Sequence, residues 1–312
     1  MKNLTYTISI IIAVTIAYIF FFYFTSIGDF KMSKLILPLL QIIMFGVGAT
    51  LTFADFTAVI KTPKKIIVGM LCQFTIMPFV GFAIAKSFNF PPEIAAGLIL
   101  IGSCPSGLAS NVMCVIANAN VALSVTLTTC ATLVAPFITP LLMKYLGGSF
   151  VDIDALKMFW DINKTIILPI IGGFMLNYFL PKFAKSIHSI LPYLSMVGIA
   201  LILMIIIASG QKSLQQVGFL LIIAVFIHNT VGYLLGFYSA KVLGFEEVDC
   251  RTIALEVGMQ NGGLGTSLAN ELGKAATMGL APAIFGSMMN VTASILAAFW
   301  KNKKPKESVE GQ

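Results

Sequence analysis

Long apolar runs recur along this chain, and each is about as long as a lipid bilayer is thick. A membrane-spanning helix needs roughly 20 mostly apolar residues, and ten segments of about that length can be traced. They are residues 4–27, 34–53, 64–86, 92–118, 121–147, 165–181, 189–209, 215–243, 250–270 and 275–300. Charged residues make up only 11% of the chain, whereas an ordinary soluble domain carries about 25%. The sequence therefore predicts an all-α polytopic membrane protein, with ten transmembrane helices in a single transmembrane domain.

The two ends of the chain agree with this interpretation. The apolar run after Met1-Lys2 is too long for the core of a secretory signal and has no clear cleavage site, so we interpret it as the first helix. Residues 301–312 form a charged tail. The five cysteines are scattered without a CxxC or metal-binding spacing, which is typical of small apolar packing residues.

Positive charge lies at the ends of the apolar runs, above all in Lys61–Lys65 and Lys301–Lys306. This is the pattern of membrane anchors, so the net charge of +7 indicates contact with the lipid bilayer and no nucleic acid partner. With both termini in the cytoplasm, twelve Lys and Arg residues lie on that side and eight lie outside. The positive-inside rule thus predicts a multi-pass protein of the cell (inner) membrane with both termini cytoplasmic. We expect it to be a monomer.

One acidic residue stands apart from the others. Glu256 lies in the middle of an apolar segment, whereas the other twelve Asp and Glu residues lie in polar connections or near segment ends. A carboxylate at bilayer depth costs about 2.5–3.5 kcal/mol even on the mild insertion scales. No Lys or Arg lies deep in a segment to pair with it, so a proton or a bound cation must neutralise it. Gly258, Gly262 and Gly263 follow, and a helix broken beside an acid indicates a cation site.

A second segment is broken in a similar way. Residues 92–118 are interrupted by Gly102-Ser103-Cys104-Pro105-Ser106-Gly107, and an offset of 155 residues lays Cys104–Gly107 over Met259–Gly262. This shift, called the repeat offset below, also pairs Gln73 with His228. It further aligns Gly81, Phe82, Ala85 and Lys86 with Gly236, Phe237, Ala240 and Lys241. Two interrupted segments at matching positions are typical of a transporter built from an internal repeat. Five helices per half is an odd number, so the second half (about 165–300) is expected to be inverted relative to the first (about 4–147).

Oxygen-bearing side chains are grouped around the two breaks. Hard cations such as sodium are bound by several oxygen ligands. The side chains that offer them are Ser110 and Asn111 after the first break, Ser124 and Thr128 on one face of the next helix, Glu256 and Gln260 at the second break, and Gln73 in the third segment. Taken singly, a membrane Ser or Thr more often bonds its own helix or a neighbouring one. Their grouping around Glu256 is what favours a cation site.

These motifs are similar to those of a known family. Gly102-Ser103-Cys104-Pro105-Ser106-Gly107 with Ser110-Asn111-Val112, and the later Glu256-Val257-Gly258-Met259-Gln260-Asn261, resemble the bile acid:sodium symporter family over essentially the whole chain. The resemblance implies a panel domain of helices 1, 2, 6 and 7 packed on a core domain of helices 3–5 and 8–10. In that core the discontinuous helices 4 and 9 cross.

The resemblance also implies two co-transported sodium ions. The first would be held by Ser110, Asn111, Ser124, Thr128 and Glu256. The second would be held by Gln73, Glu256, Gln260 and the carbonyls of Val257 and Met259. Glu256 would then be a shared ligand of both ions.

An organic anion is the substrate that the resemblance implies, imported with sodium by alternating access. It would be a bile acid or a small monocarboxylate of the pantoate or keto-acid type, and we favour the small metabolite. The helix N-termini after the breaks offer free amides and positive dipole ends that suit a carboxylate. The expected substrate residues are Gly107, Leu108, Asn261, Gly262 and Asn290. The family often has His-Asn where this chain has Met289-Asn290, which weakens what that position says about the substrate.

Two other functions stay open at this point. A proton-coupled exporter of organic anions or arsenite with the same fold would use Cys104 at the first break, although the many oxygens on the fifth helix argue against it. An intramembrane enzyme or receptor is disfavoured, because the chain lacks the GxGD, HExxH and GxSxG motifs and offers no catalytic residues. We interpret His188 as an interfacial anchor, with a proton relay as the alternative. His228, which the repeat offset pairs with Gln73, is interpreted as a hydrogen-bonded core residue.

Overall fold

The structure, a computed structural model, describes residues 12, 15–52 and 62–303. The first part of the predicted first helix and most of the charged tail therefore lie outside the described residues. The elements are α2 (Phe21–Thr25), β1 (Ser26–Ile27), β2 (Phe30–Lys31), η1 (Met32–Leu35), α3 (Ile36–Thr50), α5 (Pro63–Ser87), α6 (Pro92–Ser103), α7 (Ala109–Ile116), α8 (Val121–Tyr145), η2 (Gly147–Ser149), α9 (Ala155–Ile162), η3 (Asn163–Ile167), α10 (Leu168–Phe179), α11 (Pro181–Ile187), α12 (Leu191–Ser209), α13 (Gln211–Val242), α14 (Glu247–Gly258), α15 (Gly262–Glu271) and α16 (Leu280–Lys301). The two short strands pair as an antiparallel hairpin ahead of α3.

Helices dominate the described part of the chain, and many are long and apolar. Six are long and apolar enough to cross a membrane: Met32–Thr50, Pro63–Ser87, Val121–Ser149, Ala155–Phe179, Gln211–Val242 and Leu280–Lys301. Large apolar side chains such as Phe219, Trp160 and Phe22 point outward from the protein. This confirms the prediction of an all-α, multi-pass membrane protein.

One predicted boundary is wrong. The stretch from Asp152 to Lys164 was expected to be a polar connection before a helix starting at residue 165, but the helix begins at Ala155 and continues through the π-helical stretch η3 into α10. The Asp154 side chain accepts a hydrogen bond from the Lys157 amide at 2.9 Å, which caps the helix start. Met158, Ile162 and Ile166 recur every four residues and form a buried apolar face. The charged residues that suggested a loop belong to a helix with one buried side.

The last predicted helix starts later than expected. Residues 274–279 form turns after Gly273, which has a φ of 71°, and α16 begins at Leu280 rather than at residue 275. Glycine adopts this left-handed conformation without strain, so the turn is encoded locally by Gly273.

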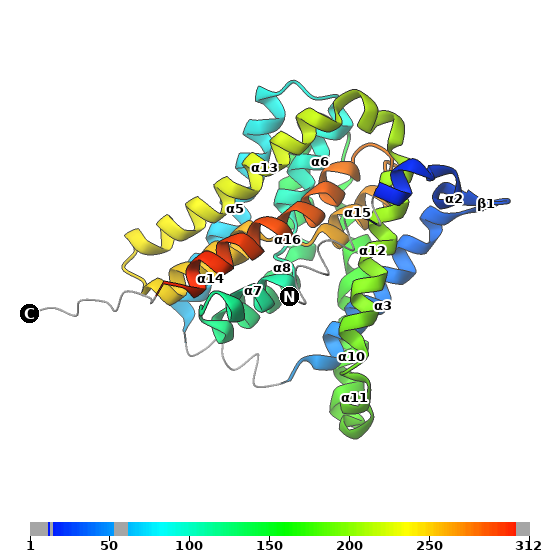
Figure 1. Ribbon diagram of the computed structural model, residues 1–312. Helices are drawn as coiled ribbons and strands as arrows, with labels where there is room; N and C mark the ends of the chain where they lie inside the picture. Colours follow the sequence, from blue (N-terminus) through cyan, green and yellow to red (C-terminus); the bar gives the residue numbers. More distant parts are fainter. Residues whose placement is uncertain (1–11, 13–14, 53–61, 304–312) are drawn as a thin grey trace, which may run out of the picture.

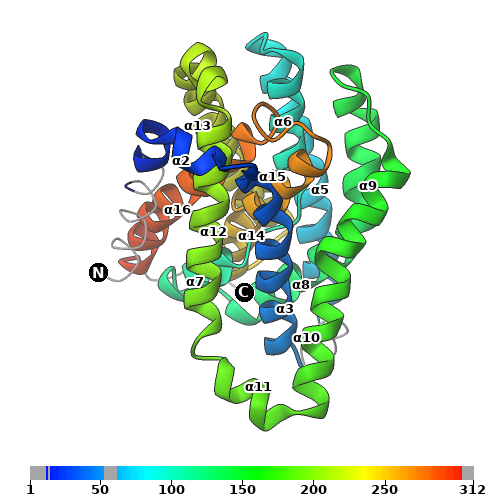
Figure 2. The same ribbon diagram turned by 90° about the vertical axis from the view of Figure 1, so that its right-hand side faces the viewer.

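The helices gather into two groups. Figure 1 shows α3, α10, α11 and α12 together on one side, with α5, α13, α14 and α16 on the other. Figure 2 gives the perpendicular view, in which α3, α10 and α12 lie in front of the second group. Within the first group α3 and α10 approach most closely, because Gly48 and Gly173 let the two backbones touch.

The two broken segments meet at the centre of the second group. The unwound residues between α6 and α7 run antiparallel to those between α14 and α15, with Ser106 opposite Gln260. The Gly107 amide donates to the Met259 carbonyl at 2.9 Å, and the Asn261 amide donates to the Pro105 carbonyl at 2.8 Å. The two bonds correspond to one another, because a shift one residue shorter than the repeat offset carries Gly107 onto Asn261 and Pro105 onto Met259.

Backbone turns elsewhere follow the repeat offset itself. Among the described residues, four of the five left-handed φ values occur in two pairs, Asn89 (54°) with Gly244 (79°) and Asn118 (51°) with Gly273 (71°), and the fifth, at Gly28 (57°), has no counterpart. Within each pair the two positions are separated by the repeat offset. The helices before and between these turns also end in register, since the same shift carries the end of α5 onto that of α13 and the end of α6 onto that of α14.

The contact between α3 and α10 provides a stability test with a built-in control. A Cβ added at Gly173 would collide with the backbone of Phe45 and Ala49, whereas one at Gly172 would lie 3.5 Å from the Phe45 ring. Overpacking of this kind costs about 1–3 kcal/mol. We expect Gly173→Ala to lower the melting temperature of the detergent-solubilised protein and Gly172→Ala to leave it unchanged. Equal melting temperatures for the two variants would contradict the close packing.

Candidate functional site

Glu256 lies in the last turns of α14, and its carboxylate is enclosed by hydroxyl groups. The side chain is buried, with 3% exposure. Its oxygens accept hydrogen bonds from Ser106 at 2.6 Å, Ser124 at 2.6 Å and Thr128 at 2.8 Å, and from Ser110. An ionised carboxylate has about four acceptor sites. Four hydroxyls thus surround one buried acid, and no basic side chain donates a hydrogen bond to it among the described residues.

The hydroxyls come from three elements whose placement follows from local sequence. Ser106 lies in the unwound crossing, and Ser110 lies in the first turn of α7. Ser124 and Thr128 are four residues apart and therefore share one face of α8. The start of α8 is fixed by Asn120, whose side chain accepts from the Leu123 amide at 3.1 Å. Of the four donors, Ser106 was not among the predicted site residues.

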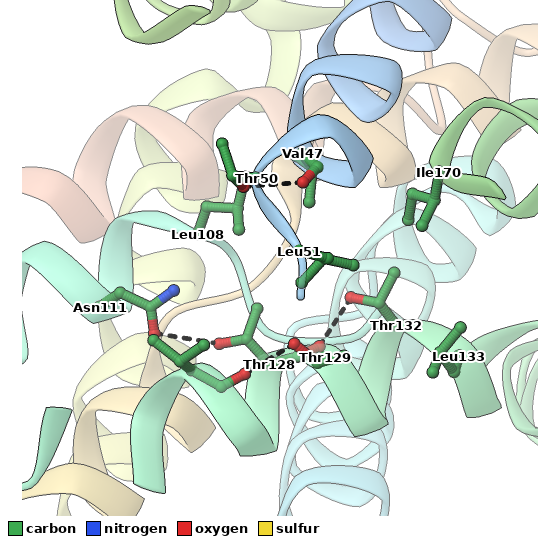
Figure 3. A pocket seen from close by; sticks show the side chains of 11 residues that line it. Val47, Thr50, Leu51, Leu108, Asn111, Thr128, Thr129, Thr132, Leu133 and Ile170 are labelled. Atoms are coloured by element: carbon green, nitrogen blue, oxygen red, sulfur yellow. Dashed lines mark hydrogen bonds between the residues drawn. The ribbon is translucent and has the colours of Figure 1, made fainter. Parts of the chain in front are cut away.

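Asn111 extends this group without touching Glu256 through a hydrogen bond in the described structure. Its Oδ1 lies 2.7 Å from the Ser124 hydroxyl and 3.5 Å from the Thr128 hydroxyl. The single hydroxyl proton of Ser124 cannot satisfy both Asn111 and Glu256 at once. Figure 3 shows Asn111 and Thr128 turned toward one another in a cavity of about 280 Å³ between α8 and the end of α3. The group therefore has more acceptor sites on oxygen than hydroxyl protons to fill them. Such an oxygen-rich set of ligands is what a hard cation prefers.

A second polar group surrounds Gln73 of α5. The Gln73 amide nitrogen donates to the Cys104 carbonyl at 2.9 Å and to Gln260 Oε1 at 2.8 Å, while Gln260 donates to the Val257 carbonyl at 2.6 Å. Gln73 Oε1 is buried and has no hydrogen-bond partner among the described residues. A buried polar atom without a partner costs about 1–3 kcal/mol. The carbonyl of Met259 accepts from Gly107 and keeps a second lone pair.

The structure thus brings the predicted ligands together as two neighbouring groups. Ser110, Ser124, Thr128 and Asn111 surround Glu256, and Gln73 and Gln260 meet beside the Val257 carbonyl. Both carboxylate oxygens of Glu256 are engaged by hydroxyls of the first group. Its role as a ligand shared by both groups stays a prediction.

Asn229 of α13 performs for α14 the task that Gln73 performs for α6. Gln73 donates to the carbonyl of Cys104 just beyond α6, and Asn229 donates to the carbonyl of Gly258 at the end of α14, at 2.8 Å. Asn229 Oδ1 accepts from Thr292 at 2.5 Å, so its oxygen is satisfied. The repeat offset had paired Gln73 with His228, the residue next to Asn229. Only an explicit search for amides near helix ends could have identified Asn229.

The two histidines occupy different surroundings. His228 is fully buried, bonds the Met77 carbonyl at 2.8 Å through Nε2 and meets the Phe285 ring edge-on, as a core residue would. His188 bonds the Ala49 carbonyl at 3.0 Å and lines a cavity between α3, α7 and α12. His188 is therefore more than the surface anchor that the sequence indicated.

All five predicted substrate residues line one small cavity at the crossing. It has a volume of about 100 Å³, and its walls include Gly107, Leu108, Asn261, Gly262 and Asn290. A larger cavity of about 320 Å³ between α3, α12 and α7 shares Leu108 and Asn290 with it. Its other walls are mostly apolar, with Thr50, His188 and Ser195 as polar exceptions.

Two expected roles at this cavity are wrong in detail. The Gly107 and Gly262 amides were expected to be free for a carboxylate, but the Gly107 amide donates to the Met259 carbonyl and the Gly262 amide donates to the Gln260 carbonyl at 3.0 Å. Gly107 matters instead because it has no side chain, since a Cβ there would lie 2.8 Å from the Gln260 carbonyl oxygen.

Cys104 is a buried packing residue. Its carbonyl accepts from Gln73, and a Cβ at Gly265 of α15 would lie 3.5 Å from its sulfur. This environment differs from the open thiol that an arsenite carrier would need.

In the described part of the chain, two further charged residues are as buried as Glu256, and their burial was not predicted from the sequence. Asp249 and Arg251 in the first turns of α14 are fully buried. Arg251 pairs with Glu247 rather than with Glu256.

Comparisons with known proteins agree with this geometry. The sequence model of the Sodium Bile acid symporter family matches residues 37–217. The chain is 39% identical over 305 residues to the uncharacterized sodium-dependent transporter YocS of Bacillus subtilis, in a match that covers 97% of this chain and 92% of the relative. It is 34% identical to the probable chloroplastic sodium/metabolite cotransporter BASS1 of Arabidopsis thaliana, over 86% of this chain and 67% of the relative. It is also 34% identical to the human ileal sodium/bile acid cotransporter, over 76% of this chain and 69% of the relative. The chain therefore belongs to the sodium bile acid symporter family, whose members are secondary transporters rather than enzymes.

Proposed function

We propose that this protein is a sodium-coupled symporter that imports a small organic monocarboxylate by alternating access. The observation that carries the proposal is the enclosure of Glu256 by Ser106, Ser110, Ser124 and Thr128. In the described structure this buried acid is surrounded by neutral oxygens and is bonded to no basic side chain. Such an environment favours the binding of a cation. The sodium-dependent relatives support the same conclusion.

The first sodium ion is assigned to Ser110, Asn111, Ser124, Thr128 and Glu256. Each hydroxyl can rotate its proton away and turn a lone pair toward a cation. Binding there joins α7, α8 and α14, and thus ties the first broken segment to the second. Sodium would therefore hold together the elements that form the substrate cavity at the crossing.

The second sodium ion is assigned to Gln73, Gln260, Glu256 and the carbonyls of Val257 and Met259. The unpaired oxygen of Gln73 is the main support for this site. Asn229 occupies the matching place in the other half, and its oxygen is satisfied by Thr292. The architecture thus does not require an unpaired amide oxygen. Among the buried amide oxygens of the described residues, only that of Gln73 lacks a hydrogen-bond partner, which fits a cation ligand.

The arrangement supports an inverted repeat, with a panel of helices 1, 2, 6 and 7 and a core of helices 3–5 and 8–10. The two backbone bonds of the crossing correspond to one another at one residue less than the repeat offset. The left-handed turns at Asn89 and Asn118 recur at Gly244 and Gly273, at the repeat offset itself. The larger cavity lies between the group of α3 and α12 and the group of α7 and α16. Rocking of one group against the other would open this cavity to alternate sides of the membrane.

The substrate carboxylate is assigned to the small cavity at the crossing, with the body of the substrate in the larger one. Asn261, Asn290 and the first turn of α15 offer polar contacts there, and the adjoining walls are apolar. We favour a monocarboxylate of the pantoate or keto-acid type over a bile acid, because the larger cavity itself has a volume of only about 320 Å³. Two sodium ions with one monoanion carry one net positive charge, so an inside-negative potential contributes about 2.3 kcal/mol per 100 mV.

Replacement of Glu256 tests sodium coupling. A ligand that binds only the folded state stabilises it by about 2.7 kcal/mol at a hundred times its Kd, so sodium should raise the melting temperature of the wild-type protein more than potassium does. Glu256→Gln keeps the shape of the side chain and removes its charge. We expect this variant to lose both the stabilisation by sodium and sodium-driven uptake in vesicles. Wild-type uptake that follows a pH gradient and ignores sodium would contradict the proposal.

Two threonines of α8 form a matched pair for the first sodium site. Thr128 donates to Glu256 at 2.8 Å, whereas Thr126 is also buried but donates to the Ala122 carbonyl of its own helix at 2.8 Å. A hydrogen-bonding group next to a charge contributes about 1.5–3 kcal/mol. We expect Thr128→Val to weaken sodium affinity, measured by thermal shift, at least about tenfold. Thr126→Val should bind sodium as the wild type does, and an equal loss in both variants would argue against the site.

Gln73→Leu tests whether a second ion is coupled. The substitution removes the unpaired oxygen and fills the space with an apolar side chain of similar size. We expect the Hill coefficient for sodium in uptake assays to fall from about two toward one, because only the first site would remain. A Hill coefficient of one in the wild-type protein would be evidence for a single coupled ion.

A further inference from the structure

Polar residues continue from Glu256 toward the start of α14. Thr252 and Asp249 precede Glu256 by four and seven residues, so all three lie on one face of the helix. Seven residues of α-helix span about 10 Å. This face is therefore polar from the candidate sodium site to the end of the molecule where α14 begins.

Side chains of neighbouring elements join these residues into a chain of contacts. Ser124 bonds Glu256 at 2.6 Å, and the Asn120 carbonyl accepts from the Ser124 amide and from the Thr252 hydroxyl, each at 3.1 Å. The Thr252 hydroxyl oxygen also accepts from the Asn120 backbone amide at 2.9 Å, Asn120 Nδ2 donates to Asp249 at 2.8 Å, and Lys65 Nζ lies 2.5 Å from Asp249. We call this set, Glu256, Ser124, Thr252, Asn120, Asp249 and Lys65, the inner polar column.

The column reaches the surface at Lys65, whose long side chain can change its conformation. Asp249 is fully buried, but the Lys65 side chain is 31% exposed. Arg251 nearby is held differently, because its guanidinium donates to Glu247 and to the carbonyls of Ala117, Trp300 and Lys303. Lys65 can turn its ammonium group into water, whereas Arg251 is fixed between the ends of α7 and α16.

The fold itself does not require these polar groups. The repeat offset that relates α6 to α14 places Ile94, Gly97 and Ile101 where Asp249, Thr252 and Glu256 lie. These α6 residues are equally buried, and apart from Ser103, whose hydroxyl donates to the Ile99 carbonyl of the same helix at 2.8 Å, the buried side chains of α6 are apolar. Replacing a buried ion pair by apolar residues is often neutral or stabilising. The column is thus an addition to one half of the structure and calls for a functional explanation.

We propose that the inner polar column is the route by which sodium leaves the Glu256 site toward the end of the molecule where α5 and α14 begin. Asp249 is a second carboxylate station on this route, and the Lys65 ammonium is a tethered cation that neutralises Asp249 between passages. The inference rests on the proposed sodium site at Glu256. In the predicted orientation this end is cytoplasmic, as import requires.

The exchange of one cation for another at Asp249 keeps the charge of its carboxylate neutralised. When sodium arrives at Asp249, Lys65 swings into water, and the buried carboxylate stays paired throughout. The neutral oxygens of Ser124, Thr252 and Asn120 lie between the two carboxylates and can solvate the ion on the way. Sodium release is then separate from the substrate cavity, which lies on the other side of α7 between α3 and α12.

Asp249→Asn in reconstituted protein tests the route. The amide keeps the shape and the contact with Asn120, and Lys65 can turn to water. We expect the sodium concentration for half-maximal thermal stabilisation to equal that of the wild type, because the Glu256 site is intact. We expect the initial rate of sodium-driven uptake to fall about tenfold, because the ion loses its second station. Glu93→Gln is the matched control, since Glu93 pairs with Lys274 at the start of α6, outside the column, and this variant should transport at the wild-type rate.

Further variants separate the possible outcomes. Lys65→Gln frees Asp249 for sodium, so stabilisation by sodium should set in at a lower sodium concentration than in the wild type. If this variant does not fold, the double variant Asp249→Asn with Lys65→Gln replaces it, because it leaves no unpaired charge at this place. The double variant should show the same slow uptake as Asp249→Asn. A wild-type rate in Asp249→Asn overturns the column and leaves the proposed function standing. Loss of sodium stabilisation in that variant also overturns it, because Asp249 would then support the site rather than a route. If sodium does not stabilise even the wild type, the proposed function fails and the column fails with it.

Discussion

The backbone pairing of the two broken segments is the constraint on which the rest of the structure depends. Backbone groups at membrane depth must find partners inside the protein, and the crossing satisfies four of them through the bonds of Gly107 with Met259 and of Asn261 with Pro105. The carbonyls at the adjoining helix ends are bonded by the amides of Gln73 and Asn229. This arrangement leaves the side chains of Ser106 and Gln260 opposite one another and allows Glu256 to meet the hydroxyls of α7 and α8. The proposed ion sites and the proposed substrate cavity therefore share one backbone junction.

The two halves share a backbone plan and differ in chemistry. Turns and helix ends recur at the repeat offset, yet α14 carries an acid, a threonine and an aspartate where α6 carries isoleucine and glycine. An amide oxygen is satisfied beside α14, and its counterpart beside α6 is not. Because the backbone is the same, these differences are best explained by what the protein binds and moves. In the proposed sodium sites, α14 supplies the carboxylate of Glu256, and the first half supplies the neutral oxygens of Ser110, Ser124 and Thr128.

Much of the site could be predicted because a lone acid in an apolar segment restricts the possibilities severely. Glu256, the breaks and the oxygen side chains of Ser110, Ser124 and Thr128 all follow from that one restriction. Ser106 was missed because a residue in an unwound segment has no periodicity that reveals its direction. Asn229 was missed because capping of a distant helix end is a tertiary contact. Asp249 and Arg251 resemble ordinary residues of a segment end, and only the packing of α5, α7 and α16 around them makes them buried. The start of α9 was misplaced because charged residues on one face concealed the apolar face of Met158, Ile162 and Ile166.

The contact between α3 and α10 has a mechanical consequence. No side chain separates the two helices at Gly48 and Gly173, so the backbones form one stiff plate in which neither helix can bend without the other. The walls that α3 contributes to the larger cavity then shift as a solid body, with little adjustment of individual side chains. For the proposed substrate site this means that the wall formed by α3 is rigid, so the length and width of an anion would decide whether it fits.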